Sequence, residues 1–337
     1  MSYFIFGGTG FIGTHLASLL HEVHPAAKIY NLDIVEPGTP LPTVKNYKPA
    51  LGKGEEHAAT FIYCDVRQPI ELEKVNITPD DVIFNFAAVH RTPGHPDPAY
   101  FETNIRGAEN VCAFAERHGI RKIVFTSSIA PYGAAEELKE ETTLPMPNTP
   151  YGISKLVAEK IHQTWQAGGE GRQLTIVRPG VVFGRGENGN FTRLYWGIRG
   201  HKFMYPGRKD TIKACIYVKE LVRFMLYRLE HHDSGVELYN CCYEPAYTIE
   251  HIVESMKRVT NMKVKVPFMP GWLIMTAAGI AGALGSPMGI CPARVRKLQI
   301  STNICGKKLS ASGYRFRYTF EEALADWYKD NGNLYLQ

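Results

Sequence analysis

Residues 3–13 read YFIFGGTGFIG, and they indicate how the first half of the chain folds. Their first four residues are apolar β-formers that favour a strand, and the apolar pattern of residues 11–20 favours a helix. Between these elements, Gly7 permits a tight turn, Gly10 lets the backbone approach a pyrophosphate, and Gly13 lets the helix pack close to the strand. A glycine pattern alone also occurs in ordinary surface turns, so the flanking elements carry the argument.

The next apolar run, residues 28–32, ends in Asp33, about twenty residues after Gly13. An acid at this distance can accept hydrogen bonds from an adenosine ribose, and the free N–H groups at a helix N-terminus bind phosphates. We therefore predict a dinucleotide site. Because a carboxylate repels a 2′-phosphate, and residues 34–38 contain no Arg or Lys to bind one, the expected cofactor is NAD rather than NADP.

Length and composition describe a globular protein with one large domain or two ordinary ones. Of the 337 residues, 45% are hydrophobic and 21% are charged, unlike a disordered chain. The net charge of +5 is modest and no run of Lys or Arg concentrates it, so binding to nucleic acid is not indicated. The small positive excess suits an anionic substrate.

The seven cysteines are odd in number, and none belongs to a C-x-x-C motif. We therefore expect reduced thiols in a cytoplasmic protein and no metal site. The chain begins with a predicted strand rather than a basic and apolar leader, so no signal peptide is expected.

One stretch, residues 268–290, carries no charge and is long enough to cross a bilayer. Several Pro and Gly residues interrupt it, which favours a buried or lid-forming helix in a substrate domain. Contact with a membrane surface is the lesser alternative, and no transmembrane segment is predicted.

Strands and helices are predicted to alternate along the first half of the chain. Apolar runs indicate further strands at residues 60–64, 82–86, 122–126 and 174–177, with helices at about 99–118 and 151–165. This alternation predicts an α/β fold with a Rossmann-type doubly wound parallel sheet. We expect an NAD-binding domain at 1–184 and a smaller C-terminal substrate domain at 185–337, with part of 208–250 returning to the sheet. Helices expected in the second half are residues 219–231, a segment capped by Thr248, and one that begins with a capping box of Thr319 and Glu322.

A second motif, Tyr151-Gly152-Ile153-Ser154-Lys155, begins a predicted helix. Residues four apart share one helix face, and an ammonium beside a phenol stabilises the phenolate, lowering its pKa from about 10. Ser128 follows a predicted strand, at the sheet edge where doubly wound folds bind ligands, and its hydroxyl can hydrogen-bond a substrate oxygen beside Tyr151. Ser127 on its own fits a turn or a helix cap, and Asn104 fits a surface or capping position.

With these motifs together, the chain resembles the extended short-chain dehydrogenases/reductases of the NAD-dependent epimerase/dehydratase family. The order and spacing of the motifs agree over nearly the whole chain. The further matching residues are Asp33, Asp65-Val66, Phe86-Ala87-Ala88, Asn104, Thr126-Ser127-Ser128, Arg178-Pro179-Gly180-Val181-Val182-Phe183-Gly184 and Ile216-Tyr217-Val218-Lys219-Glu220-Leu221.

The resemblance implies an enzyme in which Ser128, Tyr151 and Lys155 are catalytic. The cofactor-binding residues that it implies are Gly7, Gly10, Phe11, Ile12, Gly13, Asp33, Asp65, Val66, Ala87, Ala88, Val89, Asn104, Tyr151 and Lys155. Related dehydratases carry an Asp-Glu pair after the catalytic hydroxyl; Ile129 and Ala130 stand there instead, so dehydration is discounted. The resemblance also implies a homodimer formed through the helices at 99–118 and 151–165.

Within the family, residues 185–221 resemble nucleoside-diphosphate-sugar 4-epimerases and 4-reductases. The resemblance assigns Asn190 and Lys213 to the substrate phosphates, although Lys213 replaces a frequent arginine and Val181 a frequent asparagine. It implies a UDP-hexose 4-epimerase that forms a transient 4-keto sugar on bound NAD. The alternatives are a 4-keto sugar-nucleotide reductase, a dehydrogenase of a sterol-like or other apolar alcohol, and a dinucleotide sensor without catalysis.

Overall fold

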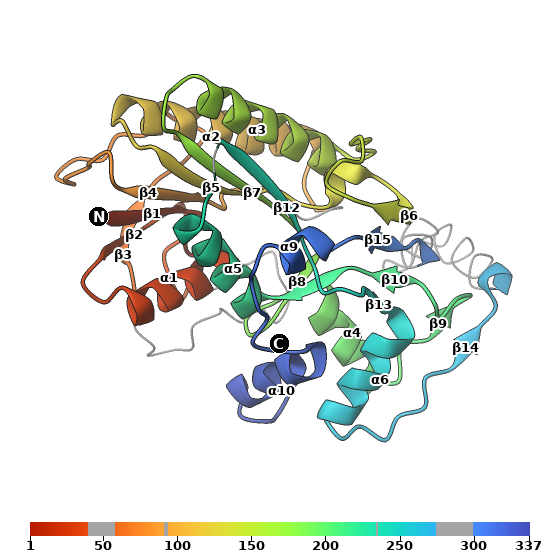
Figure 1. Ribbon diagram of the computed structural model, residues 1–337. Coiled ribbons are helices and arrows are strands. Elements are labelled where there is room, and N and C mark those ends of the chain that lie inside the picture. The colour runs from red at the N-terminus through yellow and green to blue at the C-terminus, as the bar shows by residue number, and fades with distance from the viewer. Residues whose placement is uncertain (40–57, 91–93, 234, 274–298) are drawn as a thin grey trace.

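A seven-stranded parallel sheet runs through the middle of the protein (Figure 1). The computed structural model describes residues 1–39, 58–90, 94–233, 235–273 and 299–337. The strands lie in the order β12-β7-β5-β4-β1-β2-β3, and each neighbouring pair is parallel. Their bounds are β1 Ser2–Phe6, β2 Lys28–Asp33, β3 Thr60–Tyr63, β4 Val82–Asn85, β5 Lys122–Thr126, β7 Gln173–Pro179 and β12 Val236–Cys241.

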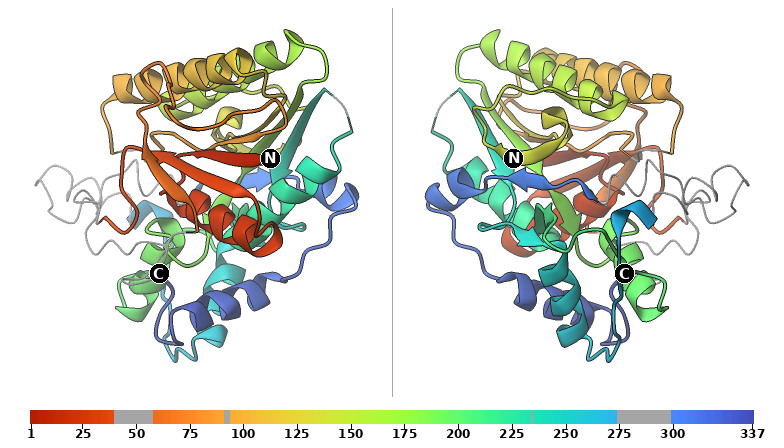
Figure 2. Two further views of the ribbon diagram at one scale, coloured as in Figure 1. Left: turned by 90° about the vertical axis from the view of Figure 1, so that its left-hand side faces the viewer. Right: turned by 90° about the vertical axis from the view of Figure 1, so that its right-hand side faces the viewer.

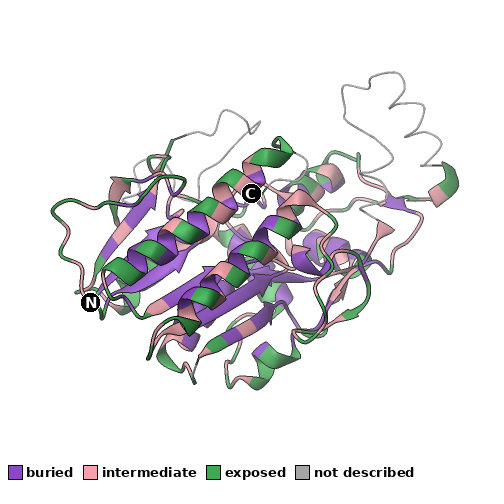
Figure 3. Ribbon diagram, turned by 90° about the horizontal axis from the view of Figure 1, so that it is seen from above, coloured by how far each residue is buried: buried purple, intermediate pink, exposed green. Residues whose placement is uncertain are grey.

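Helices cover both faces of this sheet, which gives three layers (Figure 2). On one face, α2 (Asp97–Arg117) and α3 (Pro150–Ala167) lie side by side with their outer sides exposed (Figure 3). On the other face, α1 (Phe11–Val23) packs against α5 (Val218–Glu230). Because both faces are covered, β1 and β4 are buried at every residue, as central strands of parallel sheets are. The prediction of an α/β fold with a Rossmann-type doubly wound sheet is confirmed.

Apart from the helix expected within residues 268–290, the strands and helices expected from the sequence are present, and their ends differ from the expected ones by a few residues. Thr248 and Thr319 cap the helices that follow them, α6 (Ile249–Val259) and α10 (Phe320–Asp330), and Glu322 completes the expected capping box. The sequence does not predict β6, Ala135–Lys139, because its largely exposed and charged residues are poor strand formers.

The smaller elements gather beyond the carboxyl ends of the parallel strands (Figure 1). They share an apolar cluster in which the ring of Phe183 stacks on Phe191 and Tyr217. Besides α6 and α10, the helices here are α4 Asn190–Arg199 and α9 Lys307–Ala311. One further sheet has four strands, in the order β13 Tyr247–Thr248, β10 Ile212–Lys213, β15 Thr302–Ile304 and β6. Two more sheets have two strands each. One pairs β8 Val181–Phe183 with β11 Cys215–Tyr217, and the other pairs β9 Tyr205–Pro206 with β14 Phe268–Met269.

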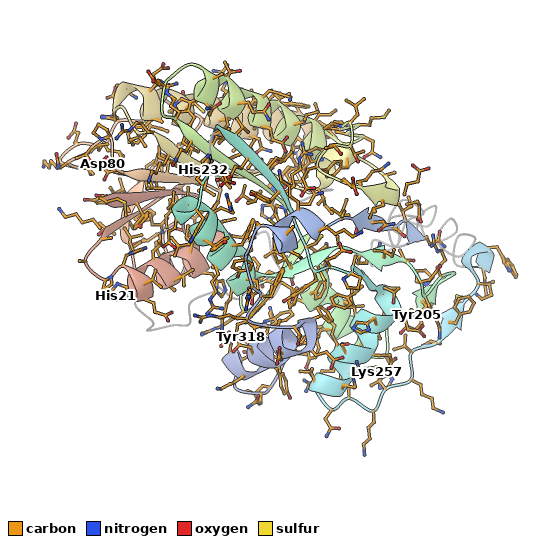
Figure 4. All side chains as sticks on the ribbon, viewed as in Figure 1. His21, Asp80, Tyr205, His232, Lys257 and Tyr318 are labelled. Carbon is orange, nitrogen blue, oxygen red and sulfur yellow. The ribbon has the colours of Figure 1, made fainter. Side chains whose placement is uncertain are left out.

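Both halves of the chain contribute to the main sheet, because β12 joins it beside β7. α5, also from the second half, packs against α1, whereas Tyr205 and Lys257 lie at the opposite end of the molecule from His21 and Asp80 (Figure 4). The division of the chain into domains at residue 184 stays a prediction.

Two further expectations concern residues that are described in part. Of the uncharged stretch 268–290, only 268–273 are described, so the helix expected there lies outside the described residues. In the described part of the chain, no helix combines the length and the apolar character that crossing a membrane requires. Six of the seven cysteines are described, and each is a buried free thiol; Cys291 lies outside the described residues.

Candidate functional site

The glycine-rich turn between β1 and α1 leaves little room for side chains. Gly7 has a φ of +77°, and a Cβ on it would lie 2.7 Å from the backbone nitrogen of Ala87, just after β4. A Cβ on Gly13 would lie 2.5 Å from the Cα of Gly8, so this glycine lets α1 pack against the turn. Among the described residues, a Cβ on Gly10 would meet one backbone oxygen, at 3.1 Å, and otherwise open space. Gly10 therefore forms a cradle that a side chain would fill.

The N-terminus of α1 is open to an anion. The backbone of Gly10 is extended, no side chain caps the helix, and no acidic residue stands in its first turn. The first-turn N–H groups, including those of Phe11 and Ile12, therefore lack a side-chain acceptor. An uncapped helix N-terminus behind a glycine cradle fits the diphosphate of NAD.

Asp33 ends β2 next to this turn. Its carboxylate accepts hydrogen bonds from the backbone nitrogens of Thr9 and Val35, each at 3.1 Å. Burial raises the pKa of Asp33, and these N–H groups oppose the rise. Within the described ranges no Arg or Lys forms an ion pair with Asp33, so a 2′-phosphate placed here would face an uncompensated carboxylate. The geometry supports the prediction of NAD.

Asn104, on α2, is 3% exposed and fixes the segment that follows β4. Its side-chain oxygen accepts a hydrogen bond from the backbone nitrogen of Val89 (2.8 Å). Its nitrogen donates to the backbone oxygen of Val89 (3.1 Å) and to the hydroxyl of Ser154 on α3 (2.8 Å). Asn104 is therefore not at the surface or capping position that its residue type alone would fit, and the cofactor-binding role that the resemblance implies stays a prediction. Asn104 ties the cofactor-lining segment predicted at Ala87, Ala88 and Val89 to the helix that carries Tyr151.

Asp65 and Val66 follow β3 at the edge of the sheet. The carboxylate of Asp65 is paired with Arg67, whose Nη2 lies 2.6 Å from Oδ2. Val66 is buried against α2, where a Cβ on Gly107 would lie 2.9 Å from its Cγ2. Its backbone oxygen accepts a hydrogen bond from Asn110 (2.8 Å). Val66 is thus held in place by its contacts with α2, whereas the carboxylate of Asp65 is already paired with Arg67.

Ser128 and Tyr151 meet where β5 ends against the start of α3, and Lys155 stands one helical turn further along α3. Burial raises the pKa of Tyr151 to about 12, and a hydrogen bond with Ser128 opposes the rise. Burial lowers the pKa of Lys155 to about 7, and the charge of Glu159 opposes the fall. The Lys155 ammonium lies over the ring of Phe125, 4.4 Å from its centroid.

Whether Lys155 lowers the pKa of Tyr151 stays a prediction, because burial raises the pKa of the phenol in this arrangement. The spacing of the motif places both residues on one helix face, but it does not show that the Lys155 ammonium lies over Phe125. A phenol with a raised pKa becomes an effective base only when positive charge is brought next to it.

A buried ion pair beneath the catalytic residues is not predicted from the sequence. Glu159, on α3, accepts hydrogen bonds from Nε (2.8 Å) and Nη2 (2.6 Å) of Arg178 on β7, and from the hydroxyl of Ser127. Arg178 lies over the ring of Tyr132, 4.7 Å from its centroid. Ser127 therefore belongs to this network, and its assignment to a turn or cap is wrong. The available signal was the spacing, because Glu159 stands four residues after Lys155.

The residues assigned to the substrate phosphates, Asn190 and Lys213, lie on separate elements and have protein partners. Asn190 begins α4, and its side-chain oxygen accepts a hydrogen bond from Arg193 (2.8 Å). The carboxylate of Glu187 accepts a hydrogen bond from the backbone nitrogen in the first turn of α4 (2.8 Å), so a phosphate there would compete with an acid. Lys213, on β10, donates to the backbone oxygen of Ile300 (2.6 Å). Phosphate binding by either residue stays a prediction.

Comparison with known proteins identifies the family. A family model described as the NAD dependent epimerase/dehydratase family matches residues 3–242, which contain both the glycine turn and the Tyr151–Lys155 motif. The chain belongs to the NAD-dependent epimerase/dehydratase family. As a member of this family, the protein is an NAD-dependent enzyme, as the sequence motifs predict.

Several curated members of the family are similar over most of their length. The N-acetyl-alpha-D-glucosaminyl-diphospho-ditrans,octacis-undecaprenol 4-epimerase of Escherichia coli O157:H7 is 32% identical over 266 residues, 77% of this chain and 80% of that protein. The UDP-glucose 4-epimerase of Halalkalibacterium halodurans is 28% identical over 296 residues, 80% of this chain and 84% of that protein. The solved UDP-glucuronic acid 4-epimerase from Bacillus cereus in complex with NAD has a TM-score of 0.73 at 19% identity, covering 99% of this chain and 100% of that chain. At that identity the structural likeness supports the fold alone.

Proposed function

We propose that the protein is an NAD-dependent 4-epimerase of a diphosphate-linked hexose, with a UDP-hexose as the nucleotide-linked substrate. The observation that carries the proposal is the contact of Ser128 with Tyr151 at the carboxyl end of β5. This is the same sheet edge as the uncapped N-terminus of α1, so a hydroxyl pair and a dinucleotide cradle share one side of the fold. Relatives named as 4-epimerases support the assignment.

This reaction needs only a few side chains and one helix N-terminus, and the described residues include them. Tyr151 takes the proton from the C4 hydroxyl, and Ser128 shares that hydrogen bond. NAD, held by the glycine turn and Asp33, would supply a reversible hydride acceptor for C4 of the sugar. Lys155 holds the nicotinamide ribose, and its charge favours the phenolate once the side chains are drawn together. Asp33 and the N-terminus of α1 hold the adenosine ribose and the diphosphate of the cofactor.

Product analysis separates epimerisation from the two redox alternatives. The purified enzyme is incubated with UDP-glucose and with UDP-N-acetylglucosamine, the C4 epimers are resolved by chromatography, and NADH absorbance is followed in parallel. Because an epimerase returns its hydride, we expect epimers to interconvert without net NADH. Stoichiometric NADH turnover would instead indicate a 4-keto reductase or an alcohol dehydrogenase, and no turnover of any diphosphate-linked sugar would refute the proposal.

A second substrate form is favoured by one relative. The enzyme from Escherichia coli O157:H7 is named for a hexose carried on undecaprenyl diphosphate, which has an apolar tail where UDP has a nucleoside. In this chain the described end of the uncharged stretch exposes apolar side chains: Phe268 is 52% exposed and Trp272 is 72% exposed. We therefore include a polyprenyl-diphosphate hexose in detergent beside the UDP-sugars. Faster turnover of the lipid-linked sugar would assign it as the substrate.

Assembly and location complete the proposal. We propose a homodimer formed through α2 and α3, because Ile153 and Val157 expose apolar side chains on the outer face of α3. We also propose a cytoplasmic location, which suits the reduced thiols.

A further inference from the structure

α3 carries an acid on the face that holds Tyr151 and Lys155. Glu159 stands one helical turn after Lys155 and is 1% exposed. Both of its carboxylate oxygens are bound by the guanidinium of Arg178, and Oε1 also accepts a hydrogen bond from the hydroxyl of Ser127. A bidentate arginine and a hydroxyl hold a buried carboxylate in one orientation.

Although Glu159 is paired with Arg178, its negative charge still acts on Lys155. The charge of Glu159 raises the pKa of Lys155 against the effect of burial. Arg178 reaches the carboxylate from β7 and lies over the Tyr132 ring. The arginine therefore anchors the acid, and the acid supplies the field at Lys155.

We propose that Glu159 is a positioning residue for the epimerisation: anchored by Arg178 and Ser127, its carboxylate presents a fixed negative charge to the ammonium of Lys155. This inference rests on the proposed function of Tyr151 and Lys155. Burial lowers the pKa of Lys155 to about 7 even with Glu159 in place, so without this acid the lysine would be neutral at neutral pH. A neutral lysine would no longer favour the Tyr151 phenolate.

No other described group supplies this charge. Other titratable groups on α3 and on the elements packed against it include Tyr151 and His162 on α3, Tyr100 on α2, Tyr132 on η1 (Ala130–Tyr132) and Arg178 on β7. His162 is neutral, because burial lowers its pKa to about 4. The acids of α2 are exposed to solvent. Among the described residues of these elements, Glu159 is therefore the acid that offsets the burial of Lys155.

The test is the pH dependence of Glu159→Gln. Because Lys155 loses its proton as pH rises, the alkaline limb of kcat should move to lower pH by about 1 unit or more, the effect of removing a nearby opposite charge. The pH dependence of NADH binding, followed by fluorescence, should move in the same direction. Activity should recover at lower pH, and Glu159→Asp should restore part of the shift. A structural role alone would lower the melting temperature and leave both pH profiles in place, which would overturn the inference.

A second variant covers the case in which Glu159→Gln fails to fold, since that change leaves Arg178 buried without a counter-charge. The double variant Glu159→Gln/Arg178→Met removes both charges and is better tolerated by a folded core. An alkaline shift in the same direction is expected, because the double variant also removes the Glu159 carboxylate; unmoved profiles would overturn the inference. Wild-type enzyme that epimerises no diphosphate-linked sugar would instead refute the proposed function, so the two failures are distinguishable.

Discussion

Replacing Lys155 by Met should abolish catalysis and, at the same time, stabilise the fold. The Lys155 side chain is 2% exposed, and its ammonium forms no hydrogen bond with a described residue. The ammonium lies 4.4 Å from the centroid of the Phe125 ring, and the charge of Glu159 acts on it. An ammonium in this position has lost most of its hydration without gaining a hydrogen-bond acceptor, which is unfavourable for folding.

The size of the effect follows from the pKa of Lys155, which burial lowers from 10.5 to about 7. The unfolded chain keeps this proton up to about pH 10.5, so between pH 7 and pH 10.5 folding releases a proton and stability rises with pH. At about 1.4 kcal/mol per unit, the buried charge costs about 4 kcal/mol at pH 7 and about 2 kcal/mol at about pH 9. Met occupies a similar volume and keeps the contact with Phe125. Lys155→Met should therefore be more stable than the wild type by these amounts.

Urea unfolding at a series of pH values, on protein freed of bound dinucleotide, measures this difference. The matched control is Lys160→Met, because Lys160 is on the same helix but exposed, and we expect a change within about 0.5 kcal/mol. Buried thiols with raised pKa, such as Cys241, lower stability at high pH equally in both proteins, so the difference isolates Lys155. A Lys155→Met protein less stable than wild type at pH 7, or a pH-independent difference, would refute the reasoning.

Four further outcomes are expected. NADH should bind more tightly than NADPH in fluorescence titrations, with Asp33→Ala narrowing the gap; tighter NADPH binding by the wild type would contradict the role of Asp33. Tyr151→Phe should lower turnover by about 10²–10⁴-fold while leaving the Kd of NADH nearly unchanged, and near-full turnover would rule out Tyr151 as the base. Lys213→Ala should raise KM for the diphosphate-linked sugar roughly 10- to 100-fold by removing a charge-assisted hydrogen bond. An unchanged KM would limit Lys213 to its bond with Ile300. Light scattering at micromolar concentration should give a dimer mass, and a monomer mass would count against the α2–α3 interface.

Much of the fold follows from local pattern. The strand, turn and helix at residues 3–20 have the predicted geometry because each step depends on neighbouring residues: Gly7 needs its positive φ, and Gly13 needs its close approach to the turn. The contacts that sequence reasoning missed join segments that are distant along the chain. Glu159 meets Arg178 across a helix and a strand, and Asn104 reaches Val89 and α3 from a neighbouring helix. Burial also depends on the whole fold, so the pKa of Lys155 could not be predicted from the motif.

The contrast between α2 and α3 shows where the chain departs from ordinary core packing. Both helices lie on the same face of the sheet, and the buried side of α2 is mainly apolar. α3 instead buries Lys155, Glu159 and His162, at helical spacing, where alanine or leucine would be less costly. Two of the three are accommodated: Glu159 is paired with Arg178, and His162 stays neutral, bonded to a backbone oxygen at 2.7 Å. Of these three side chains, Lys155 is therefore the one whose buried charge is unfavourable. A fold that pairs Glu159 with Arg178 and keeps His162 neutral, while Lys155 has no hydrogen bond to a described residue, places an unfavourable charge where the proposed reaction needs a positive one.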